Sequence, residues 1–312
     1  MTIVEISSKE YDLQFGNDQI FYNTAAFNAL NKSKCEEIFH LMFKDKKNRL
    51  GIVLGLKKKC LISPFSAPFG GFSVIDEKLS VQHIEDAVDA LKEYCVLKGV
   101  QGLSITLPPL FYKESFLTKV HHVLLQKGFN MESLDLNYLF HLENFSEKYY
   151  TEIIARNARK NLTIALTKEM SFREGSSDED LMTAYQIIKM NRLSKGFSLS
   201  MTAKEVQQTS EIVKVDSFIV SYEGVDIASA IVYHVTNKIV QVIYWGDLPE
   251  YASNKTMNFL PYKIFEHYHQ QGYGVIDVGT AMLDNKPNYG LCDFKESIGC
   301  SIQPKCAFTM KF

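Results

Sequence analysis

The chain of 312 residues lacks any apolar run close to the ~20 residues that a membrane-spanning helix requires. Its first residues, from Met1 to Ser7, contain no basic segment followed by a long apolar stretch, which is the pattern of a secretory signal. No membrane span and no export are therefore predicted, and a cytoplasmic location is expected.

Cysteine is scarce, and the six cysteines show no CxxC spacing. Several of them lie within apolar segments, which is typical of reduced, buried thiols rather than of disulfides. Cys292 and Cys300 are also open to the alternative interpretation of reactive thiols. No metal site is predicted.

An excess of either charge is also absent, because 34 Lys and Arg residues are balanced by 36 Asp and Glu residues, for a net charge of −2. This balance argues against a large nucleic-acid-binding surface, while a local basic groove stays compatible with it. With 46% apolar and 22% charged residues, the composition is that of a globular protein. The length allows one large core or two ordinary domains.

The two halves of the chain share one order of predicted elements. In the first half, two strands are followed by helix, strand, helix and strand, at 36–43, 49–57, 80–98, 102–106, 114–127 and 134–142. In the second half the order recurs, with an added strand at 238–245, at 217–222, 226–236, 257–271, 275–279, 288–299 and 301–311. A short helix at 23–34 and a mainly helical stretch at 145–168 are predicted outside the repeat. The offset of roughly 170 residues predicts two tandem α/β units with mixed sheets flanked by helices, at 1–144 and 145–312.

The stretch from 238 to 258 has the features of a phosphate-binding site. A predicted strand leads into a polar loop at 246–256, and the loop leads into the predicted helix that begins at Met257. Unpaired backbone N–H groups and the helix dipole favour a phosphate at such a helix start. Lys255 would add a positive point charge.

Two further segments allow both a structural and a functional interpretation. Residues 61–72 contain two prolines, two adjacent glycines and three phenylalanines. The segment would either pack a turn against the core or form the wall of a substrate-binding cleft, with contacts from Phe69, Gly70 and Gly71. The second segment is a predicted helix whose one face is either solvated or binds an anion through Arg156, Arg159 and Lys160.

The order of elements resembles the Gcn5-related N-acetyltransferase (GNAT) fold, and its repetition resembles the FemAB-like branch, which includes the BioF2-like acetyltransferases. Four segments support the resemblance, at 63–71, 156–161, 244–279 and 290–299. Their motifs are Ser-Pro-Phe-Ser-Ala-Pro-Phe-Gly-Gly, Arg-x-x-Arg-Lys-Asn, Tyr-Trp-Gly-Asp-x-Pro-Glu-Tyr with a later Asp-x-Gly, and Gly-Leu-x-x-Phe-Lys-x-x-x-Gly. The resemblance covers nearly the whole chain and rests on the order and spacing of these motifs.

The resemblance implies that the backbone of strand 238–245 polarises an acyl carbonyl, and that the donor lies where this strand separates from 275–279. It implies a donor-binding site formed by Tyr244, Trp245, Gly246, Asn254, Lys255, Thr256, Met257 and Asn258. Acetyl-coenzyme A or another acyl-coenzyme A is the implied donor. The Q/R-x-x-G-x-G/A loop that binds the pyrophosphate in ordinary GNAT enzymes is missing. Aminoacyl-tRNA is the alternative donor, and the long helical hairpin that some FemAB transferases use with transfer RNA is missing as well.

Acyl transfer to an amine needs an oxyanion donor, a base and an acid. The candidate catalytic residues are Asp277, Tyr289 and Lys295. Asp277 is either a base with a raised pKa or a hydrogen-bonded structural carboxylate, and Tyr289 either protonates the leaving group or caps the core. Lys295 either binds an anionic substrate or pairs with a carboxylate such as Asp277. Asp247 either steers the amine or is merely solvated.

We therefore expect a bacterial-type N-acyltransferase that acts on a small-molecule or cell-wall-precursor amine, in a cleft between two GNAT-like domains. One alternative is a FemAB-type aminoacyl transferase in cell-wall precursor synthesis. The other alternative is a catalytically silent GNAT-like module that binds a ligand or a partner.

Overall fold

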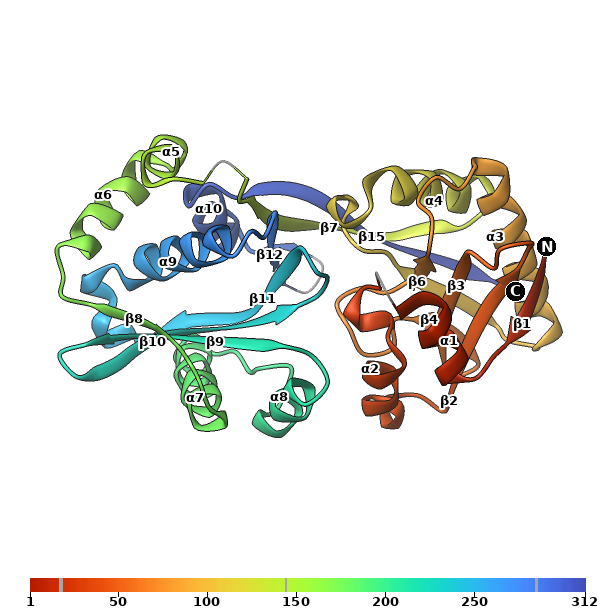
Figure 1. Ribbon diagram of the computed structural model, residues 1–312, viewed down its shortest axis with the longest axis horizontal. Helices are drawn as coiled ribbons and strands as arrows, with labels where there is room; N and C mark the ends of the chain where they lie inside the picture. Colours follow the sequence, from red (N-terminus) through yellow and green to blue (C-terminus); the bar gives the residue numbers. More distant parts are fainter. Residues whose placement is uncertain (17–18, 144, 284–285) are drawn as a thin grey trace. The chain divides into compact units, whose positions relative to one another are not determined.

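A computed structural model describes residues 1–16, 19–143, 145–283 and 286–312, which form two compact units (Figure 1). Unit 1 comprises Met1–Leu136 and Gln303–Phe312, and unit 2 comprises Asn137–Ile302. Both units mix helices with strands, as the repeated order of elements predicts. None of the described helices combines the length and the apolar character needed to cross a membrane.

Unit 1 is built on a mixed sheet with the strand order β1-β2-β3-β4-β6-β15, to which β5 adds by pairing with β3. Strands β4 and β6 are parallel, and the other neighbours are antiparallel. The strands are β1 (Thr2–Glu5), β2 (Glu37–Lys44), β3 (Leu50–Lys57), β4 (Cys60–Ser63), β5 (Phe72–Val74), β6 (Gly102–Thr106) and β15 (Ser301–Lys311), which belongs to this unit from Gln303 onward. The helices are α1 (Ser8–Phe15), α2 (Ala25–Leu30), α3 (Val81–Leu97) and α4 (Glu114–Gln126).

Strand β2 explains how helices come to cover both faces of the unit 1 sheet, because successive side chains of a strand point to opposite faces. Met42 packs into a cluster with Tyr11 and Phe15 of α1. On the other face, the ring of Phe39 lies 6.4 Å from the ring of Tyr94 of α3. The apolar core of unit 1 therefore lies in two layers, one on each side of the sheet.

Unit 2 has the strand order β7-β12-β11-β10-β9-β8, in which only β11 and β12 are parallel among the paired strands described. The strands are β7 (Asn130–His141), which belongs to this unit from Asn137 onward, β8 (Ser171–Glu174), β9 (Val215–Tyr222), β10 (Val225–His234), β11 (Ile239–Asp247) and β12 (Val275–Thr280). The short strands β13 (Met282–Leu283) and β14 (Lys286–Pro287) form a separate antiparallel pair. The helices are α5 (Glu147–Ile153), α6 (Arg156–Leu166), α7 (Asp178–Ser194), α8 (Ala203–Ser210), α9 (Thr256–Gln270) and α10 (Tyr289–Ser297).

Helices α7 and α9 lie on opposite faces of the unit 2 sheet (Figure 1). On the α7 face, the hydroxyl of Ser229 donates to the carbonyl of Ala184 at 2.8 Å, so the helix approaches β10 closely. On the α9 face, the rings of Phe218 and Tyr268 are 5.7 Å apart. Along the chain, a 3-10 turn (Pro249–Asn254) separates the end of β11 from the start of α9 at Thr256.

The two units repeat one topology, but the last strand of each comes from the segment that the sequence interpretation assigned to the other repeat. Each has antiparallel strands followed by a parallel pair, β4 with β6 and β11 with β12. In unit 1 β15 pairs with β6, and in unit 2 β7 pairs with β12. The sequence interpretation assigned 134–142 to the first repeat and 301–311 to the second. The predicted domains 1–144 and 145–312 therefore differ from the observed units, because the alternation within a strand does not identify its partner.

Candidate functional site

The parallel strands β11 and β12 pair over only three residues and then separate. Their register is Ile239↔Val275, Val240↔Ile276 and Gln241↔Asp277. Strand β11 continues to Asp247 beside β10, whereas β12 reaches Gly279, whose φ of +74° is left-handed. Unit 2 thus contains the divergence of strands that the sequence interpretation expects.

Asp277 lies at the last paired position, and its side chain is fully buried. One carboxylate oxygen accepts from Nδ2 of Asn137 and from the backbone N–H of Gly279, both at 2.8 Å. The other oxygen accepts from Nε2 of Gln241, also at 2.8 Å. The carboxylate therefore joins β7, β11 and β12 where the strands separate, which favours the structural alternative for this residue.

Lys295 of α10 is also buried, with 3% of its surface exposed. Its Nζ donates to the carbonyl oxygens of three consecutive β12 residues, each at 2.9 Å, namely Val278, Gly279 and Thr280. Burial lowers the pKa of Lys295 to about 8, while the charges of Cys300 and Asp277 act in the opposite direction. Lys295 thus holds the end of β12 against α10, a position that favours a structural role over contact with an anionic substrate.

Replacing Lys295 by methionine is expected to lower the free energy of unfolding by about 1–3 kcal/mol near neutral pH, because three carbonyl groups lose a buried donor. The lowered pKa also sets a pH dependence. Between about pH 8 and the ordinary Lys value of 10.5, the unfolded chain binds more protons than the folded chain, so Lys295 makes stability rise with pH. Urea unfolding followed by the fluorescence of Trp245, the single tryptophan, measures both effects.

The methionine variant should lose the rise in stability at alkaline pH, whereas the same change at exposed Lys238 should retain it. Identical pH slopes in the Lys295 variant and the unaltered chain would contradict the assignment.

The end of β11 packs against α7, the loop after α7, and α10. The hydroxyl of Tyr244 shares a hydrogen bond of 2.6 Å with Ser200, and the ring of Trp245 meets that of Phe294 edge-on at 6.0 Å. At Gly246, an added Cβ would lie 2.8 Å from side-chain atoms of Asn191, so a larger residue would displace that side chain. Of the predicted donor-binding residues, these three therefore shape the strand through buried contacts.

Asp247 closes β11 with a half-buried carboxyl group. Nδ2 of Asn191 donates to its backbone carbonyl at 2.6 Å and to its Oδ1 at 3.3 Å. Burial raises the pKa of Asp247, and the charge of Lys195 opposes this shift. A carboxyl group with a raised pKa at the end of the diverging strand has the properties of a general base.

The start of α9 offers backbone donors. Lys255 occupies the N-cap position with a left-handed φ of 58°, and no described side chain caps the helix. Asn254 and Thr256 are buried at this turn, and within the described residues the Thr256 hydroxyl has no hydrogen-bond partner. Met257 and Asn258, in the first turn, are half-buried. The N–H of Asn258 already donates to the carbonyl of Lys255 at 2.9 Å. The N–H groups that precede it at the helix start are those that an acceptor such as a phosphate would use.

Tyr289 is the first residue of α10, and 75% of its surface is exposed. It is not part of the core, so the alternative of a core cap does not apply. Its hydroxyl is accessible to a bound molecule, and the proton-donor role stays a prediction.

The other predicted substrate-binding residues belong to unit 1 and to α6 of unit 2. Phe69, Gly70 and Gly71 are buried in unit 1, where the ring of Phe69 contacts Tyr22 and Tyr112 at 5.2 and 4.9 Å. This burial favours the core-packing alternative. The cationic residues of α6 are exposed, and they are Arg156, Arg159 and Lys160. The guanidinium of Arg159 donates to the carbonyls at the end of α5.

Sequence reasoning missed three amides that build the site, namely Asn137, Asn191 and Gln241. All three are buried polar residues, and each donates to Asp247 or Asp277. A polar residue at an inward position of an apolar strand or helix is the signal that marks such groups.

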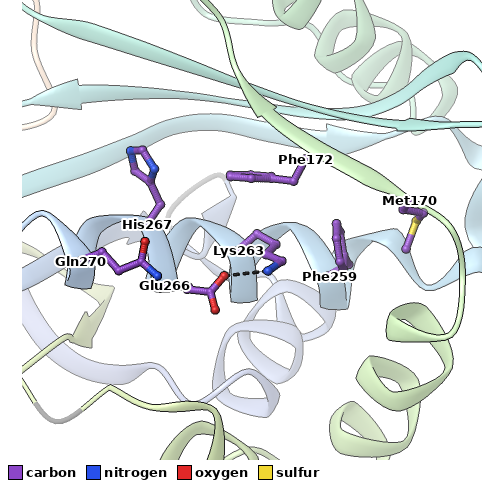
Figure 2. A pocket seen from close by; sticks show the side chains of 7 residues that line it. All are labelled: Met170, Phe172, Phe259, Lys263, Glu266, His267 and Gln270. Atoms are coloured by element: carbon purple, nitrogen blue, oxygen red, sulfur yellow. Dashed lines mark hydrogen bonds and ion pairs between the residues drawn. The ribbon is translucent and has the colours of Figure 1, made fainter.

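A cavity of about 370 Å³ lies between β8 and α9 (Figure 2). It is lined by Met170, Phe172, Phe259, Lys263, Glu266, His267 and Gln270. The lining includes none of the site residues predicted from the sequence. The cavity is therefore a feature separate from the divergence of β11 and β12.

No protein-family model matches the chain, and no curated protein sequence is significantly similar to it. Similarity appears in solved structures. A structure of FemX superposes with a TM-score of 0.74 at 14% identity, covering 100% of this chain and 98% of that chain. L-PGS from Bacillus licheniformis gives 0.60 at 13% identity, covering 96% and 90%.

A tandem GNAT protein from the clavulanic acid biosynthesis pathway gives a TM-score of 0.55 at 8% identity, covering 99% of this chain and 98% of that chain. The similarity spans both units and is similarity of fold. Together with the repeated strand order, these matches show that the chain has the tandem GNAT-like fold shared with FemX.

Proposed function

We propose that unit 2 transfers an acyl group from an activated donor to an amine, at the divergence of β11 and β12. The observation that carries the proposal is the opened strand pair, fixed by the fully buried Asp277, beside the uncapped start of α9. Two diverging parallel strands expose backbone groups that an extended donor can pair with. The helix start supplies N–H donors for a phosphate further along the same donor.

The arrangement of the site fits acyl-coenzyme A as the donor. A phosphate bound at the start of α9 and an extended arm along β11 would bring the acyl group to the divergence of the strands. The single glycine of the loop at 246–256 is Gly246, and it is used for packing against Asn191. The phosphate contacts would therefore come from the helix start and Lys255 rather than from a glycine-rich loop.

In the reaction, the amine nitrogen forms a bond to the acyl carbon as the bond from that carbon to the leaving sulfur or oxygen breaks. We assign the removal of the ammonium proton to Asp247, whose raised pKa suits a base. Backbone N–H groups of β11 would stabilise the oxyanion. Tyr289 would give its proton to the leaving group and would regain one from the nitrogen as the amide forms. Asp277 and Lys295 would act as positioning residues.

Lys255→Gln is expected to weaken the binding of acetyl-coenzyme A about 5- to 10-fold, because a charge-assisted contact to phosphate contributes about 1–1.5 kcal/mol. Isothermal titration calorimetry measures the change. Lys238→Gln removes the same charge at the opposite end of β11 and should leave the affinity unaltered. Equal affinities for the two variants would contradict the phosphate site at α9.

The choice of donor is tested by parallel assays with acetyl-coenzyme A and with aminoacyl-tRNA, each offered with lysine and with a cell-wall precursor amine. Transfer from either donor that depends on Asp247 supports the proposal and identifies the donor. Absence of transfer from both, together with no heat from acetyl-coenzyme A at millimolar concentration, would overturn it in favour of a silent binding module.

A further inference from the structure

Three metal-ligating side chains meet on the α9 face of the unit 2 sheet. They are Glu174 at the end of β8, Asp216 in β9 and His267 in α9, and their ligand atoms all lie within 4.8 Å of one another. Oε2 of Glu174 is 3.7 Å from Nε2 of His267. More than forty residues of sequence separate each from the next along the chain, so no spacing motif could reveal them.

The sheet register explains why these side chains converge. Glu174 is opposite Phe218 in the pairing of β8 with β9, and Asp216 is two residues from Phe218 along β9. Residues at this spacing point to the same face of a sheet. Helix α9 covers that face, and the ring of His267 meets the ring of Phe218 edge-on at 4.9 Å.

The buried carboxylate of Asp216 is already oriented by neighbouring groups. Its Oδ2 accepts from the hydroxyl of Tyr268 and lies 2.6 Å from Nε2 of His234, and Nδ1 of His234 is 2.7 Å from the hydroxyl of Tyr273. Oδ1 has a weaker neighbour, Nζ of Lys214 at 3.5 Å. In metal sites, hydrogen bonds of this kind usually orient the carboxylate that binds the metal.

His267 connects this cluster to the cavity between β8 and α9. It is one of the seven residues that line the cavity, and Figure 2 shows its ring pointing from α9 toward the strands. The exposed amide of Gln271 lies 2.8 Å from the same Nε2 and would have to move aside.

We propose that Glu174, Asp216 and His267 bind one divalent transition-metal ion of the Zn²⁺ class. Two carboxylate oxygens and one imidazole nitrogen suit such an ion, whereas Mg²⁺ and Ca²⁺ prefer oxygen ligands alone. The side chain of Glu174 is 43% exposed and can rotate to close the remaining distance. The cavity gives the ion an entry path and leaves a coordination position for water or a ligand. Binding would fasten the edge strand β8 to β9 and α9.

Calorimetric titration of the full chain, stripped of metal with a chelator, with ZnCl₂ tests the proposal. The expected result is one ion per chain and a higher melting temperature. His267→Ala and Glu174→Gln should each weaken the affinity at least tenfold. The matched controls His122→Ala and Glu179→Gln change exposed residues that are not members of the cluster, and these variants should bind Zn²⁺ as the unaltered chain does.

Because Glu174 is exposed, its variant keeps the test valid even if His267→Ala fails to fold. Absence of Zn²⁺ binding, or binding that both variants leave unaltered, would overturn the proposal. Substitution by Co²⁺ gives a second criterion. Visible bands without a thiolate charge-transfer band support the oxygen and nitrogen ligands, whereas a thiolate band would place the ion on cysteines and refute the site.

Discussion

Asp277→Ala is expected to lower the free energy of unfolding by about 3–5 kcal/mol, the largest stability effect predicted for a single side chain here. The substitution removes a fully buried acceptor and leaves three donors without it, on Asn137, Gln241 and Gly279. Each buried donor that loses its partner costs about 1–3 kcal/mol, and relaxation of the strands recovers part of the sum. Urea unfolding followed by Trp245 fluorescence reports directly on unit 2.

Two variants sharpen this measurement. Asp277→Asn keeps the shape and one acceptor oxygen, so a smaller loss of about 1–3 kcal/mol is expected. Asp293→Ala removes an exposed aspartate of α10 and should change stability by less than about 0.5 kcal/mol. If the Asp277 and Asp293 variants unfold at the same urea concentration, Asp277 does not hold the strands at their divergence.

Asp247→Asn is expected to reduce kcat/KM for acyl transfer by about 100- to 10,000-fold, the contribution typical of a general base. The active form is the carboxylate, so the rate should rise with pH through the pKa of Asp247 and level off above it. Burial raises this pKa above the ordinary 3.8, so the plateau begins at a higher pH than an exposed aspartate would give. Rate profiles from acidic to neutral pH, with the donor and amine for which transfer is found, measure the effect.

The control for this variant is Glu250→Gln, which removes an exposed carboxylate three residues further along the loop. It should preserve both the rate and the shape of the pH profile. A profile that retains its acidic limb in Asp247→Asn would assign the base to another group, and unaltered kcat/KM would remove Asp247 from the chemistry.

The order of elements was predictable because hydrophobic periodicity is a local property. The helix expected at 80–98 is α3 at Val81–Leu97, and the strand expected at 102–106 is β6 with the same bounds. The helix expected over 23–34 is wrong in extent: α2 spans Ala25–Leu30 and is flanked by 3-10 turns. The helical stretch expected at 145–168 breaks at Ile154, whose ψ of 152° is extended. Strand β8 was not predicted, because four residues carry too little periodicity.

The candidate site was predictable where it depends on a local pattern, and not where it depends on pairing. The loop and helix start at 246–258 follow from polar residues between a strand and a helix, and the structure places an uncapped helix there. The partners of Asp277 come from strands β7 and β11, which only the register brings together. Asn191 reaches Asp247 from α7 across 56 positions of sequence. Such contacts are fixed by tertiary packing, which no window of sequence contains.

The pairing of β15 with β6 has a consequence for the synthesis of the chain on the ribosome. Unit 1 needs residues 303–312 beside β6, yet these emerge after all of unit 2. During translation, the edge of β6 in residues 1–136 has no strand to pair with until residues 303–312 have been synthesised. An unpaired strand edge is a template for aggregation, so this interval is a period of vulnerability. The connectivity thus makes the completion of the first-made unit a late event in the maturation of the whole protein.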